Sequence, residues 1–234
     1  MNFHARLHKA EQLDNLSLSG KVLLKTLTSL KLINILFGNH RQLVNSTLQY
    51  CRSKPEKKYF RILDLGCGGG DSIHSISQKL SQNGIQAYFL GIDGNQESIA
   101  YASSRYAHHD HIEFRTANIL KDSFSIPECD LIVSSHFMYH FKDDELVTFI
   151  KKAKQKGIKH LIFSELKRSR FAYFLFKYSS LILPISKMAK KDGLLAIRRA
   201  FTIEELKIVL NKSDITNYTI DKKFWFRTLT KINL

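Results

Sequence analysis

Cysteine is scarce in this sequence, and the few cysteines have the spacing of neither a disulfide framework nor a metal site. The 234 residues include three cysteines, Cys51, Cys67 and Cys129, with no Cys-x-x-Cys pair among them. An odd and scattered set of cysteines predicts reduced thiols and no zinc-type ligand cluster. We therefore expect a cytoplasmic protein without a bound metal ion.

Long apolar runs are missing as well. No stretch reaches the roughly 20 uninterrupted apolar residues of a membrane-spanning helix. The first residues carry polar and charged groups in place of the apolar core of a secretory signal. The chain has no internal repeat and no low-complexity linker, and 234 residues suffice for one domain with a full core. These absences argue against a membrane-spanning, secreted or repeat protein.

Acidic residues are scarce in the last third of the chain. Residues 1–150 hold 16 Lys or Arg and 15 Asp or Glu, whereas residues 151–234 hold 20 and 6. A solvated basic face is the default interpretation. A field of one sign would also attract an anionic partner, such as RNA, an anionic membrane surface or an acidic carrier protein. Charge alone does not choose among the three.

Glycine, in contrast, is concentrated in one motif. The run Arg61-Ile-Leu-Asp-Leu-Gly-Cys-Gly-Gly-Gly-Asp71 leads from an apolar stretch through Gly66, Gly68 and Gly70 into an amphipathic stretch. This order predicts a buried strand, a turn and a helix. Glycine lets the main chain approach a ligand closely or take a positive φ. We expect that ligand at the carboxyl end of a parallel strand.

The residues around the glycines disfavour a phosphate ligand. A phosphate-binding P-loop needs Gly-Lys-Ser/Thr, and this chain has Gly70-Asp71-Ser72. A dinucleotide fingerprint needs Gly or Ala where Asp71 stands. An acid at a helix start repels phosphate and suits a cationic ligand group. S-adenosylmethionine (SAM) carries an ammonium, a sulfonium and a ribose but no phosphate, so the motif favours SAM.

Asp64-x-Gly66-x-Gly68-x-Gly70 resembles motif I of the class I SAM-dependent methyltransferases. The resemblance implies an α/β fold with a doubly wound, mostly parallel seven-stranded sheet whose last strand is antiparallel. Before the motif, Leu23, Leu27, Leu30, Ile33 and Phe37 have helical spacing, which predicts an N-terminal helical cap. We therefore expect this cap over residues 1–56 and a methyltransferase domain over residues 57–234. The residues that the resemblance places against the cofactor in this motif are Asp64, Gly66, Cys67, Gly68, Gly70 and Asp71.

The following strands agree with this resemblance. Gln86–Asp93 predicts a second strand that ends in an acid, and such a carboxylate can accept hydrogen bonds from both ribose hydroxyls. His111–Asn118 predicts a third strand, which ends where methyltransferases often have an Asp against the adenine amino group. Cys129–Ser135 predicts a fourth strand at the methionine end of the cofactor. These strands add five predicted cofactor contacts, at Asp93, Gly94, Asn118, Ile119 and Ser134.

Candidate bases follow the fourth and fifth predicted strands. A phenol with a pKa near ~10 needs a base to lose its proton at neutral pH. His136 and His140 come just after the fourth strand, and Glu165 ends the fifth strand, Lys159–Glu165. We name all three as catalytic candidates, although a histidine after a strand is more often a packing or cofactor-contact residue.

An apolar insert follows the fifth strand, at about residues 167–200. Phe171–Met188 is aromatic and aliphatic on nearly every side and has basic flanks. It is interpreted as helices packed on the core, as a lid over an apolar acceptor pocket, or as a membrane-surface element. We expect the lid, with Phe174 and Leu181 facing the pocket, and a weak membrane contact is compatible with it.

The later motifs are similar to those of the small bacterial methyltransferases related to ubiquinone and menaquinone biosynthesis. They are Ser134–Phe141, Glu165–Arg168 with Ala172-Tyr173, and Asp192-Gly193 through Arg198–Thr202. The resemblance implies O- or C-methylation of a small lipophilic, phenolic or polyketide- or quinone-like acceptor. The substrate-binding residues that we predict are Tyr139, Arg168, Tyr173 and Arg198.

An RNA methyltransferase or a SAM-binding RNA-associated protein is the alternative, and the basic last third speaks for it. The Asn/Asp-Pro-Pro-Tyr/Phe motif of nucleic-acid amino-methyltransferases is missing after the fourth strand. Arg198 and Arg199 offer cations for an anionic acceptor group, but two surface arginines beside a basic face are the default interpretation.

Overall fold

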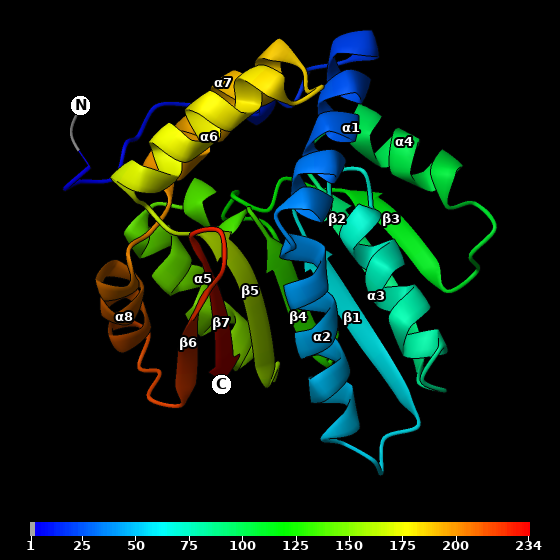
Figure 1. The fold of residues 1–234 in the computed structure, drawn as a ribbon. Helices are drawn as coiled ribbons and strands as arrows, with labels where there is room; N and C mark the ends of the chain where they lie inside the picture. The colour runs from blue at the N-terminus through cyan, green and yellow to red at the C-terminus, as the bar shows by residue number, and fades with distance from the viewer. Residues whose placement is uncertain (1–2) are drawn as a thin grey trace.

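Seven strands form one sheet in the order β3-β2-β1-β4-β5-β7-β6 in the computed structural model, which describes residues 3–234 (Figure 1). β1 pairs in parallel with β2 and β4, and β7 runs antiparallel between β5 and β6. This topology confirms the predicted fold class, including the antiparallel last strand. The strands are β1 (Tyr59–Leu65), β2 (Gln86–Asp93), β3 (Ile112–Thr116), β4 (Leu131–Ser135), β5 (His160–Leu166), β6 (Tyr218–Lys223) and β7 (Arg227–Asn233).

Helices connect and cover these strands. Two helices begin with side-chain caps: the Asn95 side chain accepts a hydrogen bond from Ser98 N, and Thr202 and Glu205 form a capping box. The α-helices are α1 (Gly20–Leu36), α2 (Asn39–Arg52), α3 (Asp71–Ser81), α4 (Gln96–Arg105), α5 (Asp143–Gln155), α6 (Arg170–Ile182), α7 (Lys187–Arg199) and α8 (Ile203–Lys212). Two 3-10 turns, η1 (Gln12–Asp14) and η2 (Met138–His140), complete the set in the described residues.

The sheet is buried on both faces, and successive strand residues point to opposite sides. Ile62 of β1 packs with Leu43 of α2 and Ile76 of α3 on one side. Leu63 packs with Phe149 of α5, in a cluster that also includes residues of α8, on the other. Helix α2 thus contributes directly to the core of the sheet, so the residues of the predicted N-terminal cap share a core with the rest of the domain.

The carboxyl ends of the parallel strands lie beneath α1, α6 and α7 (Figure 1). Helices α6 and α7 pack against each other through Phe176, Ala189 and Ile197. They form the helical insert after β5 that the sequence predicts. The insert and α1 leave space between themselves and the strand ends, and the functional side chains gather there. No helix in residues 3–234 combines the length and the apolar character needed to cross a bilayer.

Candidate active site

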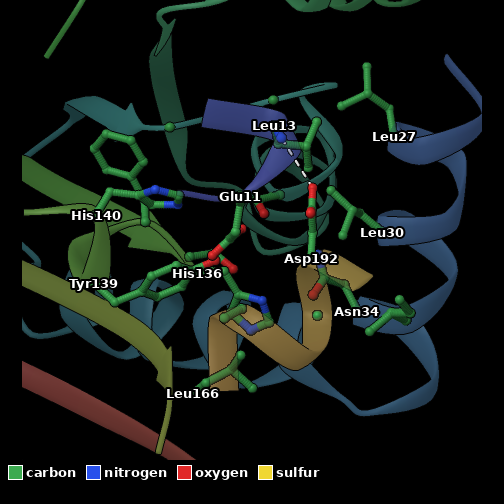
Figure 2. A pocket seen from close by; sticks show the side chains of 18 of the residues that line it. Glu11, Leu13, Leu27, Leu30, Asn34, His136, Tyr139, His140, Leu166 and Asp192 are labelled. Carbon is green, nitrogen blue, oxygen red and sulfur yellow. Dashed lines mark hydrogen bonds between the residues drawn. The ribbon is translucent and has the colours of Figure 1, made fainter. Parts of the chain in front are cut away.

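One cavity of about 450 Å³ lies at the carboxyl edge of the sheet. Its size falls in the range typical of small-molecule sites. We call its two sides the glycine-loop end, formed by Gly66–Gly69 and the residues after β2 and β3, and the insert end, formed by α6, α7 and the β6–β7 turn. Figure 2 shows His136, Tyr139 and His140 facing Leu27 and Leu30 of α1 across this space.

The glycine loop presents bare backbone to the cavity. A Cβ at Gly68 would meet only the Leu27 side chain, at 3.8 Å, so this position opens onto the ligand space. A Cβ at Gly66 would lie 2.4 Å from the Phe137 ring. Both glycines have a positive φ, at 50° and 69°, which side chains strongly disfavour. The loop therefore leaves a cradle that fits a ligand lying directly on the main chain.

Asp93 holds the end of β2 beside this loop. Its two carboxylate oxygens accept hydrogen bonds from Gly68 N at 3.0 Å and Asn95 N at 2.9 Å. Burial raises the pKa of Asp93, and these backbone donors oppose the shift. Each carboxylate oxygen keeps a further lone pair for a ligand hydroxyl. Asp93 thus fits the predicted ribose contact and lines the cavity.

Cys67, Gly94, Asn118 and Ile119 also line the glycine-loop end. The side-chain oxygen of Asn118 accepts a hydrogen bond from Leu120 N at 3.1 Å, so its amide NH₂ is the group left for a ligand. Burial raises the pKa of the Cys67 thiol well above its ordinary value, so the thiol is neutral and no nucleophile. These four residues are where the sequence analysis expects cofactor contacts.

Three other predicted cofactor residues, Asp64, Gly70 and Ser134, lie beneath the loop and do not reach the cavity. The Ser134 hydroxyl donates to Leu65 O at 3.0 Å, and Gly70 begins α3 with a Cβ position against Phe114. Asp64 is buried with one carboxylate oxygen unpartnered, and burial together with Asp93 raises its pKa. The geometry assigns these residues to supporting the loop.

Asp71 lines the cavity but is already neutralised. Its Oδ1 accepts from the Tyr106 hydroxyl at 3.0 Å and lies 3.2 Å from Lys31 Nζ and 3.5 Å from Arg105 Nη1. A carboxylate with two cationic partners has little capacity left for the cationic ligand group that the sequence analysis assigned to it. Lys31 of α1 also lines the cavity, and the sequence analysis did not predict it because no motif surrounds it.

His136 and His140 both line the cavity, in different environments. His136 has a left-handed φ of 56°, and its Nε2 is in contact with the Arg227 guanidinium. Burial and the charge of Arg227 lower the pKa of His136 well below its ordinary value. A ring held neutral beside an arginine is a poor proton acceptor, so the geometry argues against His136 as the base.

His140 is oriented by groups from distant parts of the chain. Its Nδ1 lies 2.9 Å from an Asp14 oxygen and 3.3 Å from Arg199 Nη2. The ring stacks on Tyr139 with the ring centroids 4.4 Å apart. An Nδ1–H that donates to Asp14 leaves Nε2 as the acceptor nitrogen, and no described residue hydrogen-bonds to that atom. His140 thus has the arrangement of a general base.

Arg199 binds two carboxylates of the N-terminal segment, Glu11 at 3.2 Å and Asp14 at 2.7 Å. Burial raises the pKa of Glu11 to about 8. Burial also acts to raise the pKa of Asp14, but His140, the Glu11 backbone and Arg199 outweigh it and hold that pKa at about 2. One oxygen each of Glu11 and Asp14 and a nitrogen of His140 lie within 4.8 Å of one another, which is close enough to share a metal ion. Arg199 already supplies the positive charge there.

Glu165 lies outside the cavity. It is buried, and one carboxylate oxygen accepts from Phe137 N and Met138 N at 3.0 Å each. Burial raises its pKa to about 7. These contacts hold the segment that carries His136 and His140, so Glu165 positions the candidate base instead of reaching the acceptor.

Of the predicted substrate residues, only Tyr139 lines the cavity. Arg168 is buried in an ion pair with Glu205, with oxygens at 2.6 and 2.9 Å. Tyr173 packs edge-on against Phe3 at 5.6 Å. Arg198 also lies away from the cavity, whereas Arg199, one position later on α7, points in. Tyr173 and Arg198 lie on helices, where adjacent residues face different directions, whereas Arg168 lies in the connection between β5 and α6.

The expected orientation of the insert is also corrected. Phe174 and Leu181 point outward from α6 and are exposed. Leu175 and Phe176 line the cavity in their place. Alternating aromatic and aliphatic residues made both faces of this helix look apolar, so the sequence did not distinguish the inner face from the outer one.

Comparisons with known proteins bear on this geometry. Residues 62–156 match the family model described as a methyltransferase domain. No curated protein matches the sequence. Among solved structures, human N-acetylserotonin methyltransferase in complex with SAM aligns with a TM-score of 0.61 at 13% identity, over 90% of this chain and 55% of the human one. This chain therefore spans about half the length of that enzyme.

Two further structures share the fold. Magnesium protoporphyrin IX methyltransferase from Synechocystis, solved with bound SAH, aligns with a TM-score of 0.54 at 16% identity over 84% of each chain. An O-methyltransferase family 2 protein from Planctomyces limnophilus, in complex with apigenin, aligns with a TM-score of 0.53 at 17% identity, over 75% of this chain and 51% of the other. Residues 62–156 thus match a methyltransferase domain, and the chain as a whole has the fold of these solved methyltransferases.

Proposed function

We propose that this enzyme transfers the SAM methyl group to a hydroxyl of a small lipophilic acceptor. The observation that carries the proposal is the continuity of this cavity, which joins the glycine loop to an apolar chamber with His140 between them. The chamber is closed by Ile33 and Phe37, which precede β1 in the chain, by Leu166 at the end of β5 and by Phe176 of α6. Such a wall favours an apolar body, at about 25 cal/mol for each Å² removed from water.

The cofactor would be held by the glycine loop, by Asp93 at its ribose and by Asn118 and Ile119 at its base. When bound, SAM supplies a methyl group that its sulfonium already activates. The chain's own contribution is to align the acceptor with that methyl group and to keep water out. Removing the acceptor proton is the remaining task at neutral pH.

His140 is the residue that we assign to this proton. The Nε2 atom accepts the hydroxyl proton, while the Nδ1–H remains bound to Asp14, whose negative charge stabilises the imidazolium that forms. Arg199 holds Asp14 in place at 2.7 Å. The low pKa of Asp14, about 2, keeps this carboxylate charged over the whole working range of pH.

The N-terminal segment excludes water from the chamber. Arg6 donates to Arg199 O, Tyr139 O and Phe141 O at 2.8–3.0 Å. Leu13 N donates to Asp192 at 3.1 Å, the contact dashed in Figure 2. The segment therefore spans the opening between η2 and α7. The small molecules named for two of the structural neighbours, N-acetylserotonin and apigenin, support an acceptor of this kind.

Methyl transfer from labelled SAM to a series of phenols tests the proposal. We expect turnover that improves with alkyl tail length, up to about 0.8 kcal/mol per buried methylene until the chamber is full. His140→Gln should lower kcat by about 10²–10⁴ with SAM affinity unchanged. The exposed His108→Gln is the matched control and should behave as wild type. No turnover of any phenol, or an unaffected His140→Gln enzyme, would refute this function.

RNA methylation has less support from the same structure. Part of the basic excess of the last third is internal, because Arg168, Arg199 and Arg227 are all buried. These arginines bind protein groups or line the cavity and cannot contact phosphates. Turnover of bulk tRNA with a steep dependence on salt would revive the alternative.

We also propose a weak contact between the outer face of α6 and an anionic membrane surface. Phe171, Tyr178, Leu181 and Ile182 are 61–85% exposed there. Residues 166–191 contain seven Lys or Arg and no Asp or Glu. Apolar side chains with a basic surround are typical of interfacial helices on anionic lipid.

Sedimentation with phosphatidylglycerol vesicles tests this contact. Wild-type protein should bind them and should not bind phosphatidylcholine vesicles, and Leu181→Ser with Ile182→Ser should abolish binding. The control is Ile208→Ser, at an exposed apolar residue of α8. Equal binding of both vesicle types, or a dimer in solution that covers α6, would contradict the proposal.

A further inference from the structure

Arg227 is a buried cation in the cavity wall that the proposed reaction does not use. It is the first residue of β7, pairs with Leu166 of β5 and is 2% exposed. Its guanidinium contacts His136 Nε2, and its Nε has no hydrogen-bond partner. A guanidinium carries five N–H donors, so most of its capacity is available to whatever enters the cavity.

No carboxylate among the described residues forms an ion pair with Arg227. Glu165 is the acid whose charge acts on it, but one Glu165 oxygen is occupied by Phe137 N and Met138 N, and the other has no partner. Burial raises the pKa of Glu165 to about 7, which leaves it only partly ionised at neutral pH. A buried arginine without a full counter-charge is costly, and a bound anion would remove that cost.

The surroundings of Arg227 combine weak bases with aromatic walls. His40 and His136 lie nearby, and burial lowers the pKa of both, so they are neutral and do not compete for an anion. Trp225 meets Phe37 edge-on, with the ring centroids 5.3 Å apart, and both line the cavity. Trp225 has a φ of 60°, so the β6–β7 turn holds this residue in the left-handed region.

We propose that the acceptor carries a carboxylate, which Arg227 binds while the apolar body lies against Phe37 and Trp225. The inference rests on the proposed function and narrows the acceptor to a lipophilic hydroxy acid. A guanidinium binds a carboxylate with two parallel hydrogen bonds, which fixes the orientation as well as the position of the molecule. The bound acid would thereby direct the acceptor hydroxyl toward His140.

Two molecules offer a carboxylate that Arg227 can bind: the acceptor and the methionine part of SAM. In the sheet order, β7 lies three strand spacings from β1, about 14 Å. The glycine loop follows β1, so Arg227 belongs to the insert end of the cavity, which favours the acceptor. The two sources are separated by measuring acid binding and cofactor binding on the same variants.

Calorimetry with para-pentylbenzoate and the matched neutral para-pentylbenzamide tests the inference without needing turnover. Wild-type enzyme saturated with SAH should bind the benzoate at least about ten-fold more tightly than the benzamide. Arg227→Met should abolish this preference and leave affinity for the benzamide and for SAH unchanged. Arg227→Lys should retain part of it. Lys222→Met, which removes an exposed charge from β6, is the control and should retain all of it.

Several results would overturn the inference. They are equal binding of the two probes by wild type, failure of both to bind, or an unchanged preference in Arg227→Met. A loss of SAH affinity in Arg227→Met would assign Arg227 to the cofactor carboxylate. If Arg227→Met does not fold, the wild-type comparison and Arg227→Lys still decide. Turnover of neutral phenols is a separate measurement, so the proposed function can stand where this inference fails.

Discussion

The glycine-loop end and the insert end of the cavity share one edge of the sheet, yet different parts of the chain build them. The glycine-loop end uses backbone from one short motif and the ends of the next two strands, with Gly68 and Asp93 at its centre. The insert end uses side chains from α6, α7 and the β6–β7 turn, and side chains of α1, η1 and η2 line the cavity beside it. The first end suits a ligand that is always the same, and the second can vary with the acceptor.

The buried arginines of the cavity lie at the insert end. Arg199 is paired with Glu11 and Asp14, whereas Arg227 has no ion-pair partner among the described residues. In our proposal Arg227 is therefore the cation left for an acidic acceptor. Asp93, at the glycine-loop end, is left for the cofactor ribose. Variants at one end should leave the other end's ligand nearly untouched.

Among the variants that compare the two ends, Gly68→Val should have the largest effect, a loss of SAM affinity at the glycine-loop end. The new side chain would enter the ligand space, which is open apart from Leu27, and a β-branched residue at a φ of 50° is strained. We expect SAM affinity to fall by a factor of at least about 100, equivalent to about 2.7 kcal/mol. Calorimetry measures the loss, and circular dichroism checks that the fold remains. Unchanged SAM affinity in a folded variant would refute the cofactor assignment.

Asp93→Ala should have the next largest effect. It removes the hydrogen bonds that the ribose hydroxyls would donate to the Asp93 carboxylate. A hydrogen bond to a charged acceptor is worth about 1.5–3 kcal/mol before water compensates. SAM and SAH carry the same ribose, so both should weaken together, by about ten-fold or more. Binding of para-pentylbenzoate at the insert end should stay within about two-fold of wild type. If only one of SAM and SAH weakens, Asp93 does not act through the ribose.

The sequence predicted the glycine-loop end better than the insert end, for a physical reason. Gly66, Gly68 and Asp93 lie in strand-and-turn segments whose local pattern also determines their position. Asp14 and Arg227 reach the cavity only through tertiary packing, and no local pattern marks them. Both line one cavity although they lie near opposite ends of the chain, so spacing along the sequence carried no signal.

Helix phase explains the other differences. Arg198 and Arg199 are adjacent on α7, and both neighbours of the pair are apolar, so the sequence did not indicate that Arg199 is the one that lines the cavity. The outer face of α6 is also apolar, so hydrophobicity did not distinguish it from the face that lines the cavity. Motif I was predictable because its chemistry is carried by backbone. Binding by side chains on helices requires the packed structure.

Leu175→Ala and Leu181→Ala compare the inner and outer faces of α6, and we expect a moderate difference in the acceptor KM between them. Leu175 lines the cavity and Leu181 is exposed, so the same substitution is made six residues apart on one helix. Truncating Leu175 removes apolar contact with the acceptor and should raise its KM several-fold, at about 0.8 kcal/mol per lost methylene. Leu181→Ala should leave KM unchanged and weaken vesicle binding. Equal effects on KM would show that α6 acts only through packing.

Glu11→Gln should have the smallest effect, a change in how stability depends on pH. It concerns the charged group formed by Glu11, Asp14 and Arg199. Burial raises the Glu11 pKa from about 4.5 to about 8, with Arg199 opposing the shift and Asp14 and Asp192 adding to it. The folded protein therefore keeps a proton that the unfolded chain loses, and stability falls as pH rises from about 4.5 to about 8. The slope is at most about 1.4 kcal/mol per pH unit.

Glutamine cannot ionise, so Glu11→Gln should lack this part of the slope. Glu165, whose pKa is about 7, adds a slope of the same sign in both proteins and cancels in the comparison. Chemical denaturation at pH 5.5 and pH 8.5 measures the free energy of unfolding of both proteins. Between these two values, wild type should lose about 1 kcal/mol or more of stability relative to the variant. The exposed Glu56→Gln control should follow wild type at both values. A variant that loses stability in parallel with wild type would mean that Glu11 is charged throughout, paired with Arg199 as a simple salt bridge.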